Sequence, residues 1–549
     1  MVLPPVFFKI AARWHFTCFL AARKIKTFGF HHKNNNTTTS SRAHHTPILH
    51  TDVSKCPLEG RENQTLVCDF DGTLLRPTSL FPFFMLVAFE GGGILRALML
   101  LLLSPVIFLL GSNREVALRL MIFISFFGLR KKDVNLVARA VLPKFYLENL
   151  HRQAYEVFAS CGRKVVLTRM PRVMVERFLK EYCGVETVYG VELEMMNGGD
   201  YFTGFVSCSG LVAKQSALKD LFGEVKADLG LLCSSSSRDN LLIPYCKETY
   251  VVSKSTGSNS NKLPRDKYPK PLIFHDGRLA FLPTPLASLS LFLFLPMGIV
   301  LALLRLIIGL ILPFKMSFLT AALSGVHFRV NGLENLSNEK PKKSVLYVCT
   351  HRTLIDPILL STAVQKPVPA VTYSLSLFSE FLAPMKTVRL TRDRQHDAAM
   401  MKALLSEGDL AVCPEGTTCR EPYLLRFSPL FAEMTDEIMP VAVDVKVGMF
   451  YGTTASGLKW LDPLLLVMNP TPYYRVELLG RLEKDLTCAG GWSAAEVANR
   501  VQRQLGDVLG FECTGLTRKD KYMMLAENDG VVSVDHQNIG IGIKHGCKR

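Results

Sequence analysis

Hydrophobic residues are concentrated in two long blocks, and the first covers residues 79–127. Within it, the run from 92 to 111 has nearly the length that spans a bilayer core, but Arg96 and Pro105 interrupt it. The last apolar run of the block, LMIFISFFG at 120–128, is too short to cross a bilayer alone. The block therefore predicts an apolar insertion that forms a cap or a membrane segment.

The second hydrophobic block, residues 285–314, contains a single charged residue, Arg305. Because roughly 20 consecutive apolar residues are enough to cross a bilayer core, this block is long enough for a membrane segment. Two arrangements fit the pattern. The block forms one tilted helix, or it forms two segments that break near Pro296 and Gly298, dip into the membrane and return.

Outside these blocks, short apolar and β-branched runs predict buried strands. Residues 65–75, TLVCDFDGTLL, read as a strand followed by a loop, and RKVVLT at 163–168 reads as a buried strand. From residue 344 onwards such runs alternate with helical patterns: SVLYV, AVTYS, TVRL, DLAVCPEG, IMPVAVD and YRVELLG. That alternation predicts an α/β fold with a central sheet.

A polar stretch rich in serine, asparagine and lysine, VSKSTGSNSNKLPRDK at 252–267, marks the clearest domain boundary. It separates a mixed N-terminal half from the second hydrophobic block. The predicted divisions are an N-terminal segment at 1–60, a domain at 61–250 with the insertion 79–127, a linker at 251–267, the membrane block at 285–314 and a domain at 320–530.

Composition favours a membrane over nucleic acid as the partner of this basic chain. Its 549 residues suffice for two to four domains, its formal net charge is +16, and 48% of its residues are hydrophobic. Zinc-finger spacings, aromatic RNA-binding motifs and basic helices with heptads are missing from the sequence. The 14 cysteines form no CxxC pair, which indicates reduced thiols rather than a disulfide framework or a zinc site.

The N-terminal segment contains no acidic residue before Asp52. Basic residues are interspersed there with aromatic ones, and a tract of serine, threonine and asparagine follows. Two interpretations fit this composition. The segment is a mitochondrial transit peptide, or it is an amphipathic helix on a membrane surface followed by a disordered linker.

His351 follows the strand SVLYV, and five residues later Asp356 precedes Pro357. Asp356 and Pro357 read as the N-cap and the first position of a helix, so His351 lies in the loop between strand and helix. Such loops often hold the reacting groups of α/β proteins. The spacing alone is also what an ordinary capped turn produces, so the rest of the chain must decide.

Two further segments supply positive charge and a tight turn. KTVRLTRDR at 386–394 places four cations after a short strand, which suggests a nearby bound anion. CPEGTTCREPYLLRF at 413–427 ends a strand in a Pro-Glu-Gly-Thr turn and continues to Arg420 and Arg426. In that turn Gly416 lets the backbone approach a ligand closely.

Together with the proline-bearing apolar run IMPVAVD at 438–444, these blocks resemble the signatures of the glycerolipid acyltransferases, which include HxxxxD and PEGT. The chemistry fits, because an alcohol that attacks a thioester needs a base such as His351 and a carboxylate such as Asp356 to orient that base. The resemblance assigns Arg392, Glu415 and Gly416 to acceptor binding. To these we add Arg394, Thr417 and Arg420, which lie in the same blocks.

The segment DFDGTLL at 69–75 resembles motif I of haloacid-dehalogenase-type phosphatases, with Asp69 as the nucleophile and Asp71 as the acid and base. Thr168 matches motif II, and either Lys214 or Lys247 matches motif III. Motif IV should hold paired acids for Mg²⁺, but ADLGLLCSSSSRDN at 227–240 has serines there and keeps only Asp239. The sequence therefore predicts a degenerate phosphatase site that binds no metal.

From about residue 65 to the end, the chain resembles the plant membrane-bound glycerol-3-phosphate acyltransferases. Runs such as PEGTTCREPYLLRFSPLF and FYGTTASGLK carry this likeness. The resemblance implies an α/β architecture: a haloacid-dehalogenase-like domain, membrane-embedded helices and a C-terminal acyltransferase domain. It implies glycerol 3-phosphate and acyl-CoA as substrates, a lysophosphatidic acid as product, and a role in glycerolipid synthesis such as that of cutin- or suberin-type lipids.

Acyl transfer of this kind requires no metal or other cofactor, so the sequence predicts neither. We expect an integral membrane protein of the endoplasmic reticulum or the mitochondrion. Two other functions fit parts of the chain. One is a phosphatase, alone or alongside the transferase so that a monoacylglycerol is released; the other is a membrane scaffold without catalysis. The serines at motif IV oppose the first, and the set of His351, Asp356 and Glu415 opposes the second.

Overall fold

The computed structural model describes residues 51–77, 79–112, 114–196, 198–233, 239–252, 261–337, 344–373 and 377–529. These residues form two compact units. The first runs up to Phe328 and also includes Val445–Thr454 and Leu461–Tyr474, and the second contains Arg329–Asp444, Ala455–Trp460 and the chain from Arg475. The predicted targeting segment lies mostly outside the described residues, as do the middle of the predicted linker and the serines of motif IV. The predicted domain boundaries stay predictions.

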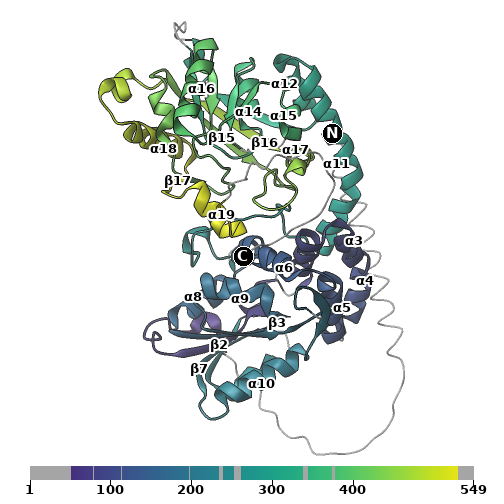
Figure 1. Ribbon diagram of the computed structural model, residues 1–549. Helices are drawn as coiled ribbons and strands as arrows, with labels where there is room; N and C mark the ends of the chain where they lie inside the picture. Colours follow the sequence, from purple (N-terminus) through teal and green to yellow (C-terminus); the bar gives the residue numbers. More distant parts are fainter. Residues whose placement is uncertain are drawn as a thin grey trace, which may run out of the picture. The chain divides into compact units, whose positions relative to one another are not determined.

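The first unit is built on a sheet of six parallel strands, in the order β1-β8-β7-β2-β3-β4. The strands are β1 (Thr51–Asp52), β8 (Cys246–Val252), β7 (Ala227–Cys233), β2 (Thr65–Asp69), β3 (Arg163–Pro171) and β4 (Thr187–Val191). Helices α8 (Arg152–Ser160) and α9 (Arg172–Glu181) lie on one face and α10 (Gly210–Phe222) on the other (Figure 1). Covering both faces explains why these strands read as continuous apolar runs.

The first hydrophobic block forms several short helices rather than one long one. They are α2 (Phe81–Leu86), α3 (Ile94–Leu102), α4 (Ser104–Leu109) and α5 (Arg114–Phe126). Gly93, with φ of 85°, precedes α3, and Pro105 stands in the first turn of α4. Both residues interrupt the run at 92–111, which is why it forms no helix of spanning length.

The second hydrophobic block forms one helix, α11 (Pro285–Ile311), followed by α12 (Phe314–Leu323). The helix continues through Pro296, so of the two arrangements left open by the sequence the structure has the single helix. Its 27 residues span about 40 Å at 1.5 Å each. Within the described residues, α11 is the one helix long and apolar enough to cross a membrane.

A second sheet has seven strands in the order β12-β11-β13-β10-β15-β16-β9. They are β12 (Thr387–Arg389), β11 (Ala370–Thr372), β13 (Leu410–Val412), β10 (Leu346–Cys349), β15 (Ile438–Lys446), β16 (Tyr473–Leu478) and β9 (His327–Asn331). In the middle of this sheet, β10 runs parallel to both β13 and β15. The helices that position the site are α14 (Asp356–Val364), α16 (Arg394–Glu407), α18 (Ala494–Leu509) and α19 (Arg518–Ala526).

Candidate active site

The register of two parallel strands brings the HxxxxD and PEGT segments together. Val348 of β10 pairs with Val412 of β13, so the loops that leave both strands begin at the same edge of the sheet. The backbone N–H of His351 donates to Glu415 Oε1 at 2.7 Å. Segments 64 residues apart in sequence are thus joined directly.

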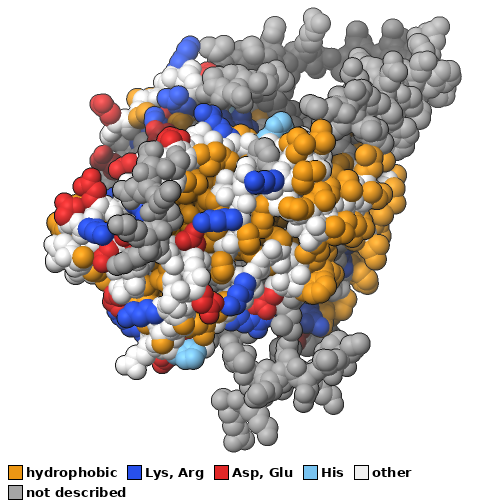
Figure 2. Space-filling model, turned by 90° about the horizontal axis from the view of Figure 1, so that it is seen from above, with side chains coloured by type: hydrophobic (Ala, Val, Ile, Leu, Met, Phe, Trp, Pro, Cys, Tyr) orange, Lys and Arg blue, Asp and Glu red, His pale blue; other side chains and the backbone are white. Residues whose placement is uncertain are grey.

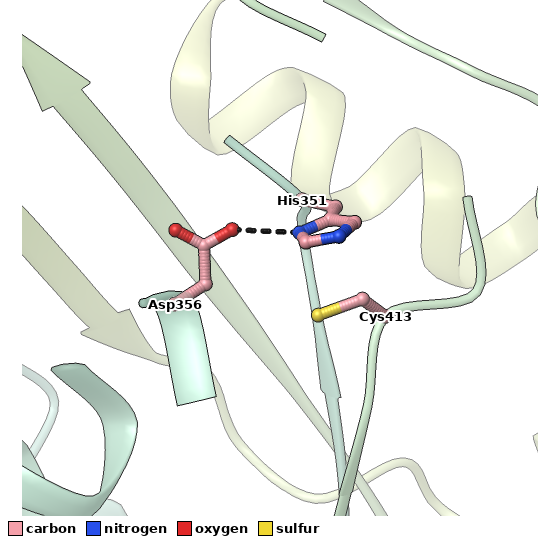
Figure 3. A group of neighbouring side chains, drawn as sticks. All are labelled: His351, Asp356 and Cys413. Atoms are coloured by element: carbon pink, nitrogen blue, oxygen red, sulfur yellow. Dashed lines mark hydrogen bonds and ion pairs between the residues drawn. The ribbon is translucent and has the colours of Figure 1, made fainter. Parts of the chain in front are cut away.

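His351 and Asp356 form a hydrogen-bonded pair, with 3.0 Å between Nδ1 and Oδ2 (Figure 3). The Asp356 side chain is fully buried, whereas 22% of the His351 side chain is exposed. With the proton on Nδ1 donated to the carboxylate, the lone pair of Nε2 is free to accept a proton from a substrate. The geometry therefore fits a general base with its orienting carboxylate.

Backbone and hydroxyl donors hold the Asp356 carboxylate in place. The N–H groups of Arg352 and Thr353 donate to Oδ2 at 2.6 and 2.9 Å, and the Thr353 hydroxyl donates to Oδ1 at 2.7 Å. Asp356 is the first residue of α14, and Ile355 occupies the N-cap. The predicted N-cap is thus one residue off, because the carboxylate closes the loop behind it instead of capping the helix ahead.

Cys413 lies beside this pair, and its Sγ and the nearest atoms of His351 and Asp356 are all within 4.8 Å of one another (Figure 3). Histidine, aspartate and cysteine are ligands that zinc accepts. The Asp356 oxygens already accept hydrogen bonds, however, and burial raises the pKa of the Cys413 thiol well above its usual value. Burial thus favours the protonated form of the thiol, and His351 and Asp356 are already joined by their own hydrogen bond.

Glu415 connects two loops through its buried carboxyl group. Besides the bond from His351, its Oε2 accepts the backbone N–H of Leu425 at 2.9 Å. Burial raises the pKa of Glu415 to about 7, and the two backbone donors moderate that rise. Gly416 follows with φ of 66°, and a Cβ there would meet no atom within 4 Å. The backbone conformation, and not crowding by neighbouring atoms, requires the glycine.

A cleft of about 360 Å³ opens beside this turn, and Glu415 and Gly416 belong to its lining. Four arginines line it as well: Arg392, Arg394, Arg426 and Arg518. Of the predicted acceptor residues, Arg392, Arg394, Glu415 and Gly416 are thus brought together. His351, Thr417 and Arg420 are not part of this lining.

Arg392 has φ of 72°, a left-handed conformation that an arginine rarely adopts. The buried carboxylate of Asp397 holds it there by accepting the Arg392 N–H at 2.9 Å and the N–H and hydroxyl of Thr391 at 2.7 and 2.9 Å. Backbone strain at a cleft of this kind is often maintained for function.

The phosphatase-like residues meet at the carboxyl ends of β2 and β3 in the first unit. Asp69 pairs with Lys214, which settles the choice of motif III lysine, since Lys247 instead pairs with Asp228 at 2.7 Å. Asp71 accepts the Thr168 hydroxyl at 2.6 Å and the Arg169 N–H at 2.7 Å.

Protein-family models match both units. Residues 65–252 match the haloacid-dehalogenase-like domain of RAM2-like glycerol-3-phosphate acyltransferases, and residues 327–444 match the acyltransferase model. The chain is 54% identical to glycerol-3-phosphate acyltransferase 1 of Arabidopsis thaliana over 85% of its own length and 82% of that protein. The chain belongs to the glycerol-3-phosphate acyltransferase family.

Two further members of the family are similar over most of their lengths. The Petunia hybrida glycerol-3-phosphate acyltransferase RAM2 is 49% identical over 84% of this chain and 97% of that protein. The probable glycerol-3-phosphate acyltransferase 2 of Arabidopsis thaliana is 46% identical over 87% of this chain and 93% of that protein. The predicted family and the pairing of a phosphatase-like domain with an acyltransferase domain are confirmed.

Sequence reasoning missed two cations that shape the site of this acyltransferase. The buried Arg352 donates to the carbonyl oxygens of Arg420 and Glu421, both at 2.8 Å, and so anchors the loop after the PEGT turn. Lys521 of α19 is also buried and donates to the Thr418 carbonyl oxygen at 2.6 Å and to the Thr417 hydroxyl at 3.3 Å. Arg352 directly follows the motif histidine, and this position could have drawn attention to it in the sequence. No local sequence pattern distinguishes Lys521.

Proposed function

We propose that this chain transfers an acyl group from acyl-CoA to a hydroxyl group of glycerol 3-phosphate and so forms a lysophosphatidic acid. The observation that carries the proposal is the hydrogen bond between His351 Nδ1 and Asp356 Oδ2, in a chain 54% identical to a protein named glycerol-3-phosphate acyltransferase 1. The basic cleft next to Glu415 supports an acceptor that carries a phosphate.

In this reaction His351 Nε2 accepts the proton of the substrate hydroxyl while its oxygen attacks the thioester carbonyl carbon. Asp356 stabilises the imidazolium that forms. Collapse of the tetrahedral intermediate breaks the C–S bond, and the imidazolium returns its proton to the departing CoA thiolate. Every proton is accounted for by His351 and the two substrates, so the proposed reaction requires no metal or other cofactor.

The test is acyl transfer by membranes that contain the protein. Labelled acyl-CoA is supplied with glycerol 3-phosphate or with a lysophosphatidic acid, and membranes without the protein are the control. Label in newly formed lysophosphatidic acid supports the proposal. Label that enters phosphatidic acid alone would assign the chain a different acceptor.

We also propose that the first unit does not dephosphorylate the product. Lys214, the lysine of motif III, pairs with Asp69, and both Asp71 oxygens accept hydrogen bonds, so these side chains are kept and the change lies in the metal site. In the sequence, serines replace the acids that would help to hold Mg²⁺. An aspartate that attacks a phosphate needs such a cation, because the two anions repel each other.

Purified protein given glycerol 3-phosphate, acyl-CoA and Mg²⁺ is therefore expected to stop at lysophosphatidic acid. Lipid products are separated and counted for the wild type and for Asp69→Asn. Monoacylglycerol that the wild type makes and Asp69→Asn does not would show a bifunctional enzyme and contradict the proposal. Monoacylglycerol from both proteins would reveal a contaminating phosphatase.

We further propose that the protein is an integral membrane protein, held through α11 in the endoplasmic reticulum or the mitochondrion. Only 17% of the most apolar 18-residue stretch of α11 is buried. On the face of the protein shown in Figure 2, hydrophobic side chains form a broad patch at the right of the view. The large exposed side chains of α11 are all aliphatic or methionine: Leu293, Met297, Ile299, Val300, Leu303, Leu304, Ile307, Leu310 and Ile311.

The single charge of α11 is compatible with this proposal because hydrogen bonds satisfy it. The Arg305 guanidinium donates to the carbonyl oxygens of Val467, Asn469, Ser324 and Pro470, at 2.6 to 3.1 Å. Fixed carbonyl dipoles therefore replace water around a charge that would otherwise be costly in an apolar setting.

Extraction of membranes with alkaline carbonate is expected to leave the protein in the pellet. An exposed apolar surface of this length binds lipid by the hydrophobic effect, which alkaline pH does not weaken. A peripheral membrane protein bound through charge serves as the control for complete extraction. Recovery of the chain in the supernatant would mean that it is attached only peripherally.

A further inference from the structure

Arg518 lines the basic cleft from a helix that lies well beyond the segment matched by the acyltransferase model. That segment ends at residue 444, whereas Arg518 is the first residue of α19. The cleft also contains Thr517, which precedes the helix, so the start of α19 forms part of its wall.

The charges in this wall favour a bound anion. Burial lowers the pKa of Arg518 below its usual value, and the positive charge of Arg392 lowers it further. The cleft also contains two carboxylates, but Asp397 accepts three donors from Thr391 and Arg392, and Glu415 accepts two backbone N–H groups. Both acids already accept several hydrogen bonds, so an anion from outside would relieve the repulsion between the guanidinium groups of Arg392 and Arg518.

The position of Arg518 relative to the turn is fixed by contacts on both sides. One helical turn further on, the Lys521 ammonium donates to Thr418 and Thr417 and holds α19 against the PEGT segment. Upstream, the N–H of Arg426 donates to the Leu516 carbonyl oxygen at 2.9 Å. Thr517 and Asp520 form a capping box that starts the helix at this point.

We propose that Arg518, together with Arg426, binds the phosphate group of the acceptor, so that α19 is part of the glycerol 3-phosphate site. Guanidinium groups bind phosphate oxygens through paired, charge-assisted hydrogen bonds, and a phosphate dianion has three such oxygens to offer. The proposal rests on the proposed function. Acyl-CoA also carries phosphates, and the experiment must therefore separate the two substrates.

The test compares Arg518→Ala and Arg518→Lys with Lys519→Ala, an exposed cation one residue along the same helix. KM is measured for glycerol 3-phosphate at saturating acyl-CoA, and for acyl-CoA at saturating acceptor. In Arg518→Ala the acceptor KM is expected to rise roughly tenfold to a hundredfold, with kcat and the acyl-CoA KM little changed. Arg518→Lys should recover part of the loss, and Lys519→Ala should match the wild type.

Three outcomes would overturn the inference. An unchanged acceptor KM would remove Arg518 from the site. A rise in the acyl-CoA KM alone would assign the arginine to a phosphate of CoA. Equal rises in both constants would indicate a structural role for the side chain.

A binding measurement without acyl-CoA separates this inference from the proposed function. Glycerol 3-phosphate, and inorganic phosphate as a simpler probe, should raise the Tm of the wild type more than that of Arg518→Ala. If the wild type binds but transfers no acyl group, the inference holds and the proposed function fails. If it transfers acyl groups while both proteins show the same ligand-induced Tm shift, the function holds and the inference fails.

Discussion

Replacing His351 with alanine is expected to lower kcat for acyl transfer by roughly two or more orders of magnitude, the usual loss when a general base is removed. Asp356→Asn should lower kcat by a similar factor. An amide that donates to Nδ1 would leave the proton of the neutral imidazole on Nε2, where the base must be free. Initial rates at saturating concentrations of both substrates measure the effect.

Cys413→Ser is the matched control for these variants. Its Sγ lies in the same cluster as the pair, but the thiol has no part in the proposed proton transfer. This variant should keep most of the wild-type kcat. Circular dichroism and Tm establish that each variant is folded, which matters for Asp356 because it accepts buried backbone N–H groups. Near-normal turnover in a folded Asp356→Asn would refute the pairing.

Replacing Arg392 or Arg394 with alanine is expected to weaken acceptor binding by roughly 1.5–3 kcal/mol, as the loss of a hydrogen bond to a charged group usually does. Both arginines line the cleft, and Arg392 is held there in a left-handed conformation. The acceptor KM should therefore rise far more than the acyl-CoA KM. Steady-state kinetics with each substrate varied in turn provide the measurement.

Lys386→Ala serves as the control for the arginine variants. Lys386 lies in the same basic segment, but it is not part of the cleft lining, and its exposed ammonium lies 3.7 Å from Glu407. It should change neither KM appreciably, because exposed ion pairs contribute little. Parallel rises of both KM values in the arginine variants would instead point to a general folding defect.

Local patterns predicted the centre of the site well. His351 and Asp356 are five residues apart across one turn, so strand and helix signals were sufficient to place them together. The contact between His351 and Glu415 follows from two neighbouring parallel strands of similar register, which an alternating α/β pattern already suggests. In the first unit, Asp71 and Thr168 meet for the same reason at the ends of β2 and β3.

Contacts over longer stretches of sequence could not be predicted in this way. Choosing Lys214 over Lys247 required knowing which of two basic side chains reaches Asp69. Lys521 reaches Thr417 across more than a hundred residues, and no spacing rule covers that distance. Arg420 was assigned to the acceptor because it follows the PEGT turn, yet it does not line the cleft, since neighbouring residues of an irregular loop point in different directions.

The conformation of Arg392 has a consequence for the evolution and engineering of this enzyme. A left-handed arginine is strained by roughly 1–2 kcal/mol, a cost that glycine avoids. Selection for folding alone would therefore favour glycine at this position, and selection for substrate binding would favour arginine. Screens that reward only thermal resistance would be expected to recover changes at residue 392 that give a more stable protein with a weaker affinity for the acceptor.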